Sequence, residues 1–203
     1  MKALLFKEFQ MTFNWKTFVS YIALLFLIGT IFGHIQVALF AFTFALMHSS
    51  ILEDDINDAD VFINSLPVSR RMVVASKFLA TMIEVALMLG TVYGSKIIVP
   101  LFSDLNWQTA LLTFAGALIL IGFYYTCYYV FGLKLLNVIL VILFIMATVV
   151  FPILLNLNYL TKLIQIIQFL SEGIGLVIAT SSSLLLVIVF YVISYKVYQR
   201  KEF

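Results

Sequence analysis

The sequence has few of the residues from which soluble enzymes build their chemistry. It contains one cysteine, Cys127, among 203 residues, which excludes an internal disulfide and a metal site built from cysteines. The two histidines, His34 and His48, give poor support to a metalloenzyme or an intramembrane protease. No Gly-x-x-x-x-Gly-Lys, Gly-x-Ser-x-Gly or His-Glu-x-x-His sequence occurs, so the chain cannot bind ATP through a P-loop. We therefore expect no catalytic residue, no metal site and no cofactor bound by this chain.

Charge is also scarce. Charged residues make up 11% of the chain, compared with about 25% in a typical globular protein, and apolar residues make up 64%. The net charge of +2, without a long basic cluster, argues against a nucleic-acid partner. A soluble domain of this size could not hide so much apolar surface from water, so we expect the chain to lie in a membrane.

The apolar residues gather in six stretches that are long enough, or nearly so, to cross a bilayer. A hydrocarbon core of ~30 Å takes about 20 mostly apolar residues of helix. The stretches cover residues 17–33, 35–52, 73–100, 108–132, 135–157 and 174–196. The sequence therefore predicts an all-α polytopic membrane protein with six transmembrane helices, in a single domain over residues 1–203.

The basic residues predict the orientation of these spans. If the N-terminus lies in the cytoplasm, only Lys96 and Lys162 of the 12 Lys and Arg residues fall on the outer side. Cytoplasmic loops of membrane proteins carry the excess of Lys and Arg. Because six spans return the chain to the side on which it began, both termini are predicted to be cytoplasmic.

Two segments outside the spans have amphipathic patterns. In residues 1–16, Leu5, Phe9 and Phe13 recur every four positions, which predicts an interfacial helix before the first span. Residues 158–173 have a similar pattern and predict an external amphipathic helix before the last span. The remaining parts are spans one and two over 17–52, a cytoplasmic loop over 53–71, spans three to five over 72–157, and span six with a cytoplasmic tail over 174–203.

The cytoplasmic loop begins with an acidic run. Asp54, Asp55 and Asp58 form an Asp-Asp-x-x-Asp pattern, which on a helix puts two carboxylates at positions i and i+4. Such a cluster could hold Mg²⁺ bound to a diphosphate, as in membrane prenyltransferases, but those enzymes need two facing clusters and this chain has one. The other interpretations are a solvated acidic face and a docking surface for a cytoplasmic partner, and we favour the docking surface.

Several polar residues are predicted within the membrane near its cytoplasmic side. Glu84 lies roughly 10 Å deeper than Lys77 along the third span, where an acid costs on the order of 2.5–3.5 kcal/mol to insert. His48 could pair with Glu84 for structure or gating, although Glu84 could instead reach the interface or bond a Ser or Thr. Tyrosines at the end of span four could line a path for amphipathic cargo or form an aromatic belt. The candidates for a translocation pathway are His48, Glu84, Tyr124, Tyr125 and Tyr128.

Two short motifs resemble those of a known family. Residues 64–71 read Asn-Ser-Leu-Pro-Val-Ser-Arg-Arg and lead to Lys77, and the chain opens with Met-Lys-Ala-Leu-Leu-Phe-Lys-Glu-Phe. Both are similar to the third-span turn and the N-terminal interfacial helix of small bacterial type-2 ABC exporter permeases. Length, number of spans and orientation fit the same family. Within it, the chain looks closest to the membrane subunits of the phenol-soluble-modulin peptide exporter kind.

The resemblance implies a division of labour between subunits. Permeases of this family dimerise, and each binds a separate ATPase subunit that holds ATP and Mg²⁺. A coupling helix between spans two and three, here residues 53–63, would seat in a groove on the ATPase. Arg70 and Arg71 would pair with the ATPase or with inner-leaflet headgroups, unless they only follow the positive-inside preference. The residues implied in coupling are Glu53, Asp54, Asp55, Ile56, Asp58, Asp60, Val61, Phe62, Arg70 and Arg71.

We therefore expect the chain to be the permease subunit of an ATP-driven exporter in the bacterial plasma membrane, without enzymatic activity of its own. The expected cargo is an amphipathic peptide, a toxin or a lipid-like compound, and the second permease chain could be the same or a different one. Two other functions stay open. One is an ion-coupled secondary carrier that uses Glu84 and His48, and the other is a Mg²⁺-dependent membrane prenyl- or lipid-transferase that uses Asp54, Asp55 and Asp58.

Overall fold

The computed structural model describes residues 2–12, 23, 35–57, 59, 63, 68–95, 106–156, 166, 169 and 173–200. These residues form an all-helical arrangement, and no strand occurs among them. The helices are α1 (Lys2–Thr12), α3 (Ile35–Ile56), α5 (Arg70–Ser95), α6 (Trp107–Asn156) and α8 (Gly173–Gln199). The first predicted span and most of the predicted external helix over 158–173 lie outside the described residues.

Three of the described helices are long and apolar enough to cross a membrane. They are the segments Arg70–Gly94, Trp107–Leu143 and Gly173–Gln199. The second predicted span is also helical, because α3 covers it and continues for one more turn to Ile56. The all-helical fold class expected from the apolar stretches is therefore confirmed.

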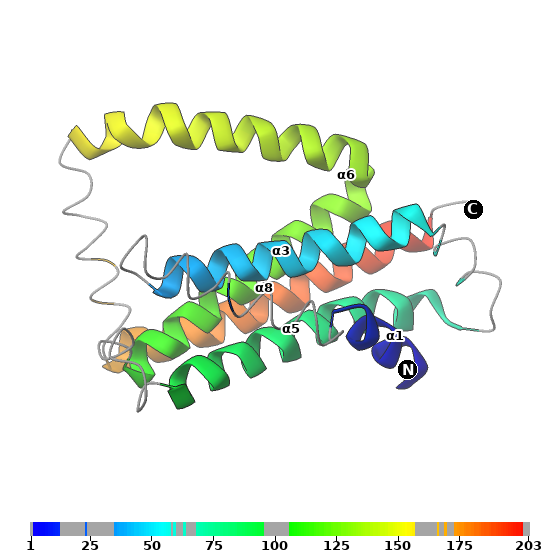
Figure 1. Ribbon diagram of the computed structural model, residues 1–203, viewed down its shortest axis with the longest axis horizontal. Coiled ribbons are helices and arrows are strands. Elements are labelled where there is room, and N and C mark those ends of the chain that lie inside the picture. Colours follow the sequence, from blue (N-terminus) through cyan, green and yellow to red (C-terminus); the bar gives the residue numbers. More distant parts are fainter. Residues whose placement is uncertain are drawn as a thin grey trace.

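The helices form a bundle in which α6 has a central position. Its first half runs beside α3, α5 and α8, and its contact with α8 is the most extensive between any two elements described (Figure 1). Helix α1 is short and packs against α5 and α3 at one end of the bundle (Figure 1). A helix therefore covers residues 2–12 of the segment predicted to be interfacial, and its buried positions are Leu4 and Glu8 and not Leu5 and Phe9.

A sharp bend divides α6 at Gly132. This residue has φ +75°, a left-handed conformation that glycine adopts without a steric penalty. After the bend, the second half runs back along the outside of the bundle and stands apart from it (Figure 1). The bend falls at the predicted boundary between spans four and five. Side chains that follow it, including Leu135, Val138 and Val141, are more than half exposed, which suits a helix surrounded by lipid or by another subunit.

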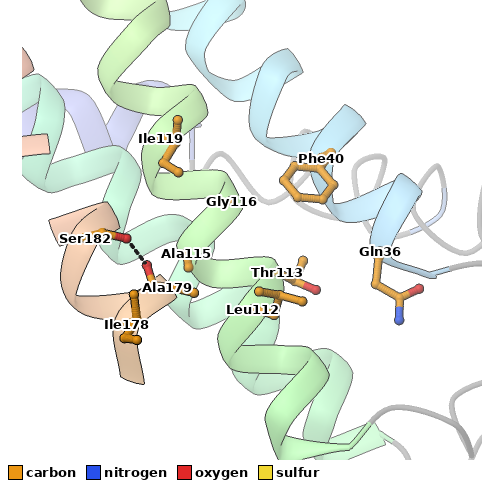
Figure 2. Close-up of a pocket in the computed structure, with 10 residues that line it drawn as sticks. All are labelled: Gln36, Phe40, Leu112, Thr113, Ala115, Gly116, Ile119, Ile178, Ala179 and Ser182. Atoms are coloured by element: carbon orange, nitrogen blue, oxygen red, sulfur yellow. Dashed lines mark hydrogen bonds between the residues drawn. The ribbon is translucent and has the colours of Figure 1, made fainter. Parts of the chain in front are cut away.

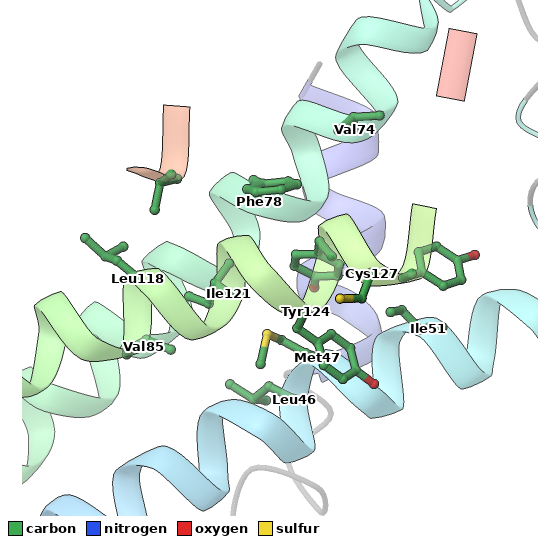
Figure 3. Close-up of a cluster of buried hydrophobic side chains, with 14 of the residues drawn as sticks. Leu46, Met47, Ile51, Val74, Phe78, Val85, Leu118, Ile121, Tyr124 and Cys127 are labelled. Carbon is green, nitrogen blue, oxygen red and sulfur yellow. The ribbon is translucent and has the colours of Figure 1, made fainter. Parts of the chain in front are cut away.

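The core lies where α3, α5 and the first half of α6 meet. Figure 3 shows side chains from the three helices, among them Met47, Phe78 and Ile121, pointing toward one another. Cys127 belongs to this cluster and is buried, as expected of an inert packed thiol. Close approach of α6 to α8 depends on Gly122, because a Cβ at this position would overlap the Phe190 ring.

Candidate functional site

A buried group of charged residues joins three helices at the end of the bundle that carries α1. We call it the charge cluster and define it as Lys7 and Glu8 of α1, Asp54 of α3 and Lys77 of α5. The exposed fraction of the side chain is 2% for Lys77 and Asp54, 6% for Glu8 and 27% for Lys7. Charges this deeply buried are tolerated only when they are paired.

The positions of these residues follow from helix geometry. Lys7 and Glu8 are neighbours on α1, and Glu8 shares a face with Leu4, through which α1 packs on the bundle. On α3, Ser50 and Asp54 are four residues apart and therefore project from the same face. Lys77 lies two turns after the start of α5. The cluster is thus assembled from three segments that are distant in the sequence.

Each charge in the cluster contacts a charge of opposite sign. The ammonium group of Lys77 pairs with Asp54 and lies 3.5 Å from Glu8 Oε1. Lys7 pairs with the same aspartate and lies 3.6 Å from Glu8 Oε1. Ser50 Oγ donates a hydrogen bond of 2.9 Å to Glu8 Oε2 and accepts one of 3.2 Å from Lys77 Nζ. Two ammonium groups and two carboxylates therefore neutralise one another.

The two lysines control the protonation of Asp54. Burial by itself raises the pKa of this carboxyl group, but the charges and hydrogen bonds of Lys77 and Lys7 outweigh burial and hold its pKa below the usual range. Asp54 is therefore ionised at neutral pH, which its ion pairs require.

The charge cluster joins three helices through its ion pairs. Its carboxylates are engaged by lysines, and among the described residues no group of three or more His, Cys, Asp or Glu could hold a metal ion. What it does is fix α1 and the end of α3 to α5. The sequence patterns did not predict this site, because Lys7, Glu8 and Lys77 entered only through the family motifs and the predicted depth of the third span. The available signal was two lysines and two acids near the same predicted interface.

The residues implied in coupling fall on different faces of the last turn of α3. Glu53, Asp55 and Ile56 are exposed, and 77% of Ile56 is accessible. Asp54 points to the opposite side and is part of the charge cluster. The other predicted coupling residues of the loop, Asp58, Asp60, Val61 and Phe62, lie outside the described residues.

The two arginines at the start of α5 contact the end of α8. Arg70 Nη1 donates hydrogen bonds to the carbonyl oxygens of Gln199 at 2.8 Å and Tyr198 at 3.4 Å. These carbonyls belong to the last turn of α8, where a cation is favourable. Arg71 is exposed, and its guanidinium carbon lies 5.8 Å from the centre of the Tyr195 ring.

The predicted pathway residues pack inside the bundle. His48 Nδ1 lies 2.8 Å from Tyr124 Oη, and Tyr125 Oη lies 2.7 Å from Thr81 Oγ1. Tyr124, Tyr125 and Tyr128 are all buried, and Glu84 is also buried. The pairing of Glu84 with His48 stays a prediction, since the contact that His48 makes here is with a tyrosine.

A groove of about 500 Å³ lies at the opposite end of the bundle, between α3, α6 and α8 (Figure 2). Figure 2 shows Phe40 and Gln36 on one side of it and Ile178 on the other. Its polar side chains are Gln36, Thr113 and Ser182. None of the residues proposed from the sequence to line a pathway is among the residues that line this groove.

Comparison with known proteins identifies the family. Residues 3–199 match the family model described as an ABC-2 family transporter protein. Neither the curated proteins nor the solved structures give a match. Members of the ABC-2 family are membrane-embedded permease subunits of ABC transporters, which generally are not catalytic themselves and work with an ABC ATPase subunit. Because the match takes in nearly the whole chain, this protein belongs to the ABC-2 transporter family.

Proposed function

We propose that the chain is the permease subunit of an ATP-driven exporter in the bacterial plasma membrane, of the phenol-soluble-modulin exporter kind. Its cargo is an amphipathic peptide, a toxin or a lipid-like compound. A separate ATPase subunit binds ATP and Mg²⁺, and a second permease chain, identical or different, completes the membrane part. Family membership supports the transport role and the ATPase partner.

The proposal includes six spans with both termini in the cytoplasm. Helix α1, the last turn of α3 and the start of α5 meet in the charge cluster, and the start of α5 contacts the end of α8 through Arg70. These parts therefore lie at one end of the bundle, as they must if both termini are on the same side (Figure 1). The bend at Gly132 lies at the same end and is followed closely by Lys134 (Figure 1). This arrangement supports an inner side rich in basic residues.

The charge cluster is the observation that carries the mechanism. Residues 53–63, which we call the docking segment, begin on the last turn of α3, and their second residue is held by Lys77 and Lys7. A displacement of the docking segment by the ATPase is therefore transmitted to α5 and α1 through ion pairs and not only through the backbone. Such a connection between an ATPase and the membrane helices is what an ABC permease needs to change between two states.

The structure gives less support to the two other functions considered. A Mg²⁺-dependent transferase needs Asp54 as an open ligand, whereas the two lysines occupy this carboxylate. An ion-coupled carrier needs Glu84 and His48 on an open pathway, whereas Glu84 is buried and His48 Nδ1 lies 2.8 Å from Tyr124 Oη. Neither function needs an ATPase partner, which the family implies.

Transport by inverted membrane vesicles tests the proposal. Vesicles that contain the chain and its ATPase subunit are given a fluorescent amphipathic peptide. We expect the peptide to accumulate inside when ATP is added, because the cytoplasmic face is then outside. Accumulation only in right-side-out vesicles would contradict export, and accumulation driven by a pH gradient without ATP would favour a carrier.

Two variants separate docking from transmission. Glu53→Gln combined with Asp55→Asn changes exposed acids of the docking segment and should weaken ATPase binding. Asp54→Asn changes the buried acid between them and should leave binding intact but lower transport for each ATP hydrolysed. If Asp54→Asn reduced binding as much as the exposed pair did, the charge cluster would not be a transmission element.

A further inference from the structure

A second groove lies between α5 and α8, on the side of the bundle that includes Arg71. Its volume is about 520 Å³, and its walls are almost entirely apolar. Several lining side chains are exposed along it, among them Leu79, Leu184 and Ile188. The lining residues are Ala75, Phe78, Leu79, Met82, Leu184, Val187, Ile188 and Tyr191. Because both helices are long enough to cross a membrane, this groove faces the lipid or another membrane chain.

One mouth of the groove carries a cation. Arg71 precedes Ala75 by one helical turn and therefore lies on the same face of α5. Across the groove, Tyr191 Oη donates a hydrogen bond of 3.4 Å to the carbonyl oxygen of Arg71, and the guanidinium lies over Tyr195. Among the described residues, no carboxylate forms an ion pair with Arg71. Its planar fork of N–H donors is suited to a phosphate group.

The groove and the cation at its mouth together have the length of one leaflet. From Arg71 to Met82, α5 rises roughly 16 Å at about 1.5 Å per residue. Half of a hydrocarbon core of ~30 Å is about 15 Å. If the apolar walls of the groove lie beside the acyl chains of one leaflet, Arg71 lies at the depth of the lipid headgroups of that leaflet.

We propose that this groove binds a phospholipid with an anionic headgroup, from the leaflet on the Arg71 side. The acyl chain lies between α5 and α8, and the phosphate contacts Arg71. The adjacent Arg70 has a different role, because it binds the carbonyls of the last turn of α8. The proposal does not depend on what the protein transports or on its direction of transport.

Native mass spectrometry tests this site on the full chain, extracted from nanodiscs that contain equal amounts of phosphatidylglycerol and phosphatidylcholine. We expect one phosphatidylglycerol to stay bound to each chain in preference to phosphatidylcholine. Arg71→Gln should lower this preference about fivefold, since a basic residue at the interface attracts an anionic lipid by ~1 kcal/mol. Lys134→Gln removes the same charge from an exposed position on α6 and should leave the preference unchanged.

A second pair of variants tests the apolar part. Ala75→Phe fills the groove and should remove the retained lipid, whereas Leu87→Phe alters an exposed position of α5 outside the lining and should not. The proposal fails if Arg71→Gln and Lys134→Gln have equal effects, or if the lipid persists in folded Ala75→Phe. It also fails if Ile188→Cys forms a disulfide between two chains in the membrane, because a second copy would then occupy the groove. If Ala75→Phe does not fold, the comparison of Arg71→Gln with Lys134→Gln decides whether the groove binds an anionic phospholipid.

Discussion

Lys77 has an ammonium group buried between two carboxylates that come from different helices. It contacts Asp54 of α3 and Glu8 of α1, and it donates a hydrogen bond to Ser50. A buried ammonium group lowers the stability of the fold unless charges of opposite sign surround it. Removing one lysine together with one acid should therefore destabilise the protein less than removing either residue alone. The balance of charge among Lys7, Glu8, Asp54 and Lys77 therefore decides how stable this end of the bundle is.

Replacement of Lys77 by Met should lower the free energy of unfolding by about 3–5 kcal/mol, because it leaves one uncompensated buried carboxylate. The double variant Lys77→Met with Asp54→Leu removes one charge of each sign and should be less destabilised than Lys77→Met alone. Unfolding in mixed detergent micelles measures the free energy of unfolding of the wild type, of Lys77→Met and of the double variant. Lys134→Met, at an exposed position, is the control and should change stability little. Additive effects of Lys77→Met and Asp54→Leu would show that the two residues are not coupled.

The protonation of Asp54 predicts a pH dependence. A carboxyl group whose pKa is lower in the folded state than in the unfolded state stabilises the fold above its unfolded pKa, and this contribution is lost as the pH falls through the folded pKa. The stability difference between wild type and Asp54→Asn should thus be constant from about pH 7 to 5 and shrink only below about pH 4. This difference is measured by unfolding the wild type and Asp54→Asn at a series of pH values across this range. A difference that grew as the pH fell from 7 to 5 would mean that burial outweighs the lysines and raises the pKa of Asp54 in the folded state.

Helices α6 and α8 pack closely because small residues of α6 face the Phe190 region of α8. A Cβ at Gly122 would overlap the Phe190 ring and lie 3.2 Å from Phe190 Cβ, so that the clash involves the base of the side chain. One turn further along, Thr126 Oγ1 lies 3.1 Å from Ser194 Oγ. At the scale of elements, this interface sets the distance between two membrane helices.

Gly122→Ala should cost about 1–3 kcal/mol through overpacking, whereas Gly90→Ala should have no effect or a small favourable one. No atom lies within 4 Å of a Cβ built at Gly90, which makes it a matched control on another membrane helix. Thermal unfolding in detergent compares the two variants. Phe190→Ala should relieve the defect of Gly122→Ala; if it did not, the clash would not be its cause.

The contact of Arg70 with α8 predicts a local effect. Arg70→Met removes the donors to the carbonyls of Tyr198 and Gln199, so the last turn of α8 should open more easily by about 1 kcal/mol. Amide hydrogen exchange near residues 195–199 measures this opening. Lys134→Met, at an exposed position of α6, should leave the exchange of these amides unchanged, and equal effects of the two variants would argue against a specific cap at Arg70.

For the whole molecule, the sequence predicts the helices better than their connections through side chains. Residues 35–52, 73–100, 108–132, 135–157 and 174–196 are apolar enough to be recognised as spans, and helices α3, α5, α6 and α8 cover most of them. Even the bend at Gly132 falls where two spans were expected to meet. The charge cluster could not be predicted in the same way. Periodicity reports on one helix at a time, whereas Lys7, Asp54 and Lys77 meet only when three helices pack.

Because periodicity reports on one helix at a time, it also could not predict the surroundings of the candidate pathway residues. Tyr124 and Tyr125 were expected to form a path or an interfacial belt, and the structure buries both in contact with His48 and Thr81. A span with many aromatic residues is consistent with a transport path, with an interfacial belt and with a packed core. Which of the three applies depends on the helices that pack against the span. Tests of transport through these residues therefore need the assembled complex and not the single chain.

We propose that this chain works as the membrane subunit of a transporter driven by a separate ATPase. Mild-detergent purification from the native membrane, with mass spectrometry of what accompanies the chain, tests it most directly. We predict a P-loop ATPase at one-to-one stoichiometry, reduced when the exposed acids Glu53 and Asp55 are both changed to Lys and retained when exposed Lys134 is changed to Glu. A chain that comes out alone, and stays alone after crosslinking in the membrane, would contradict the claim.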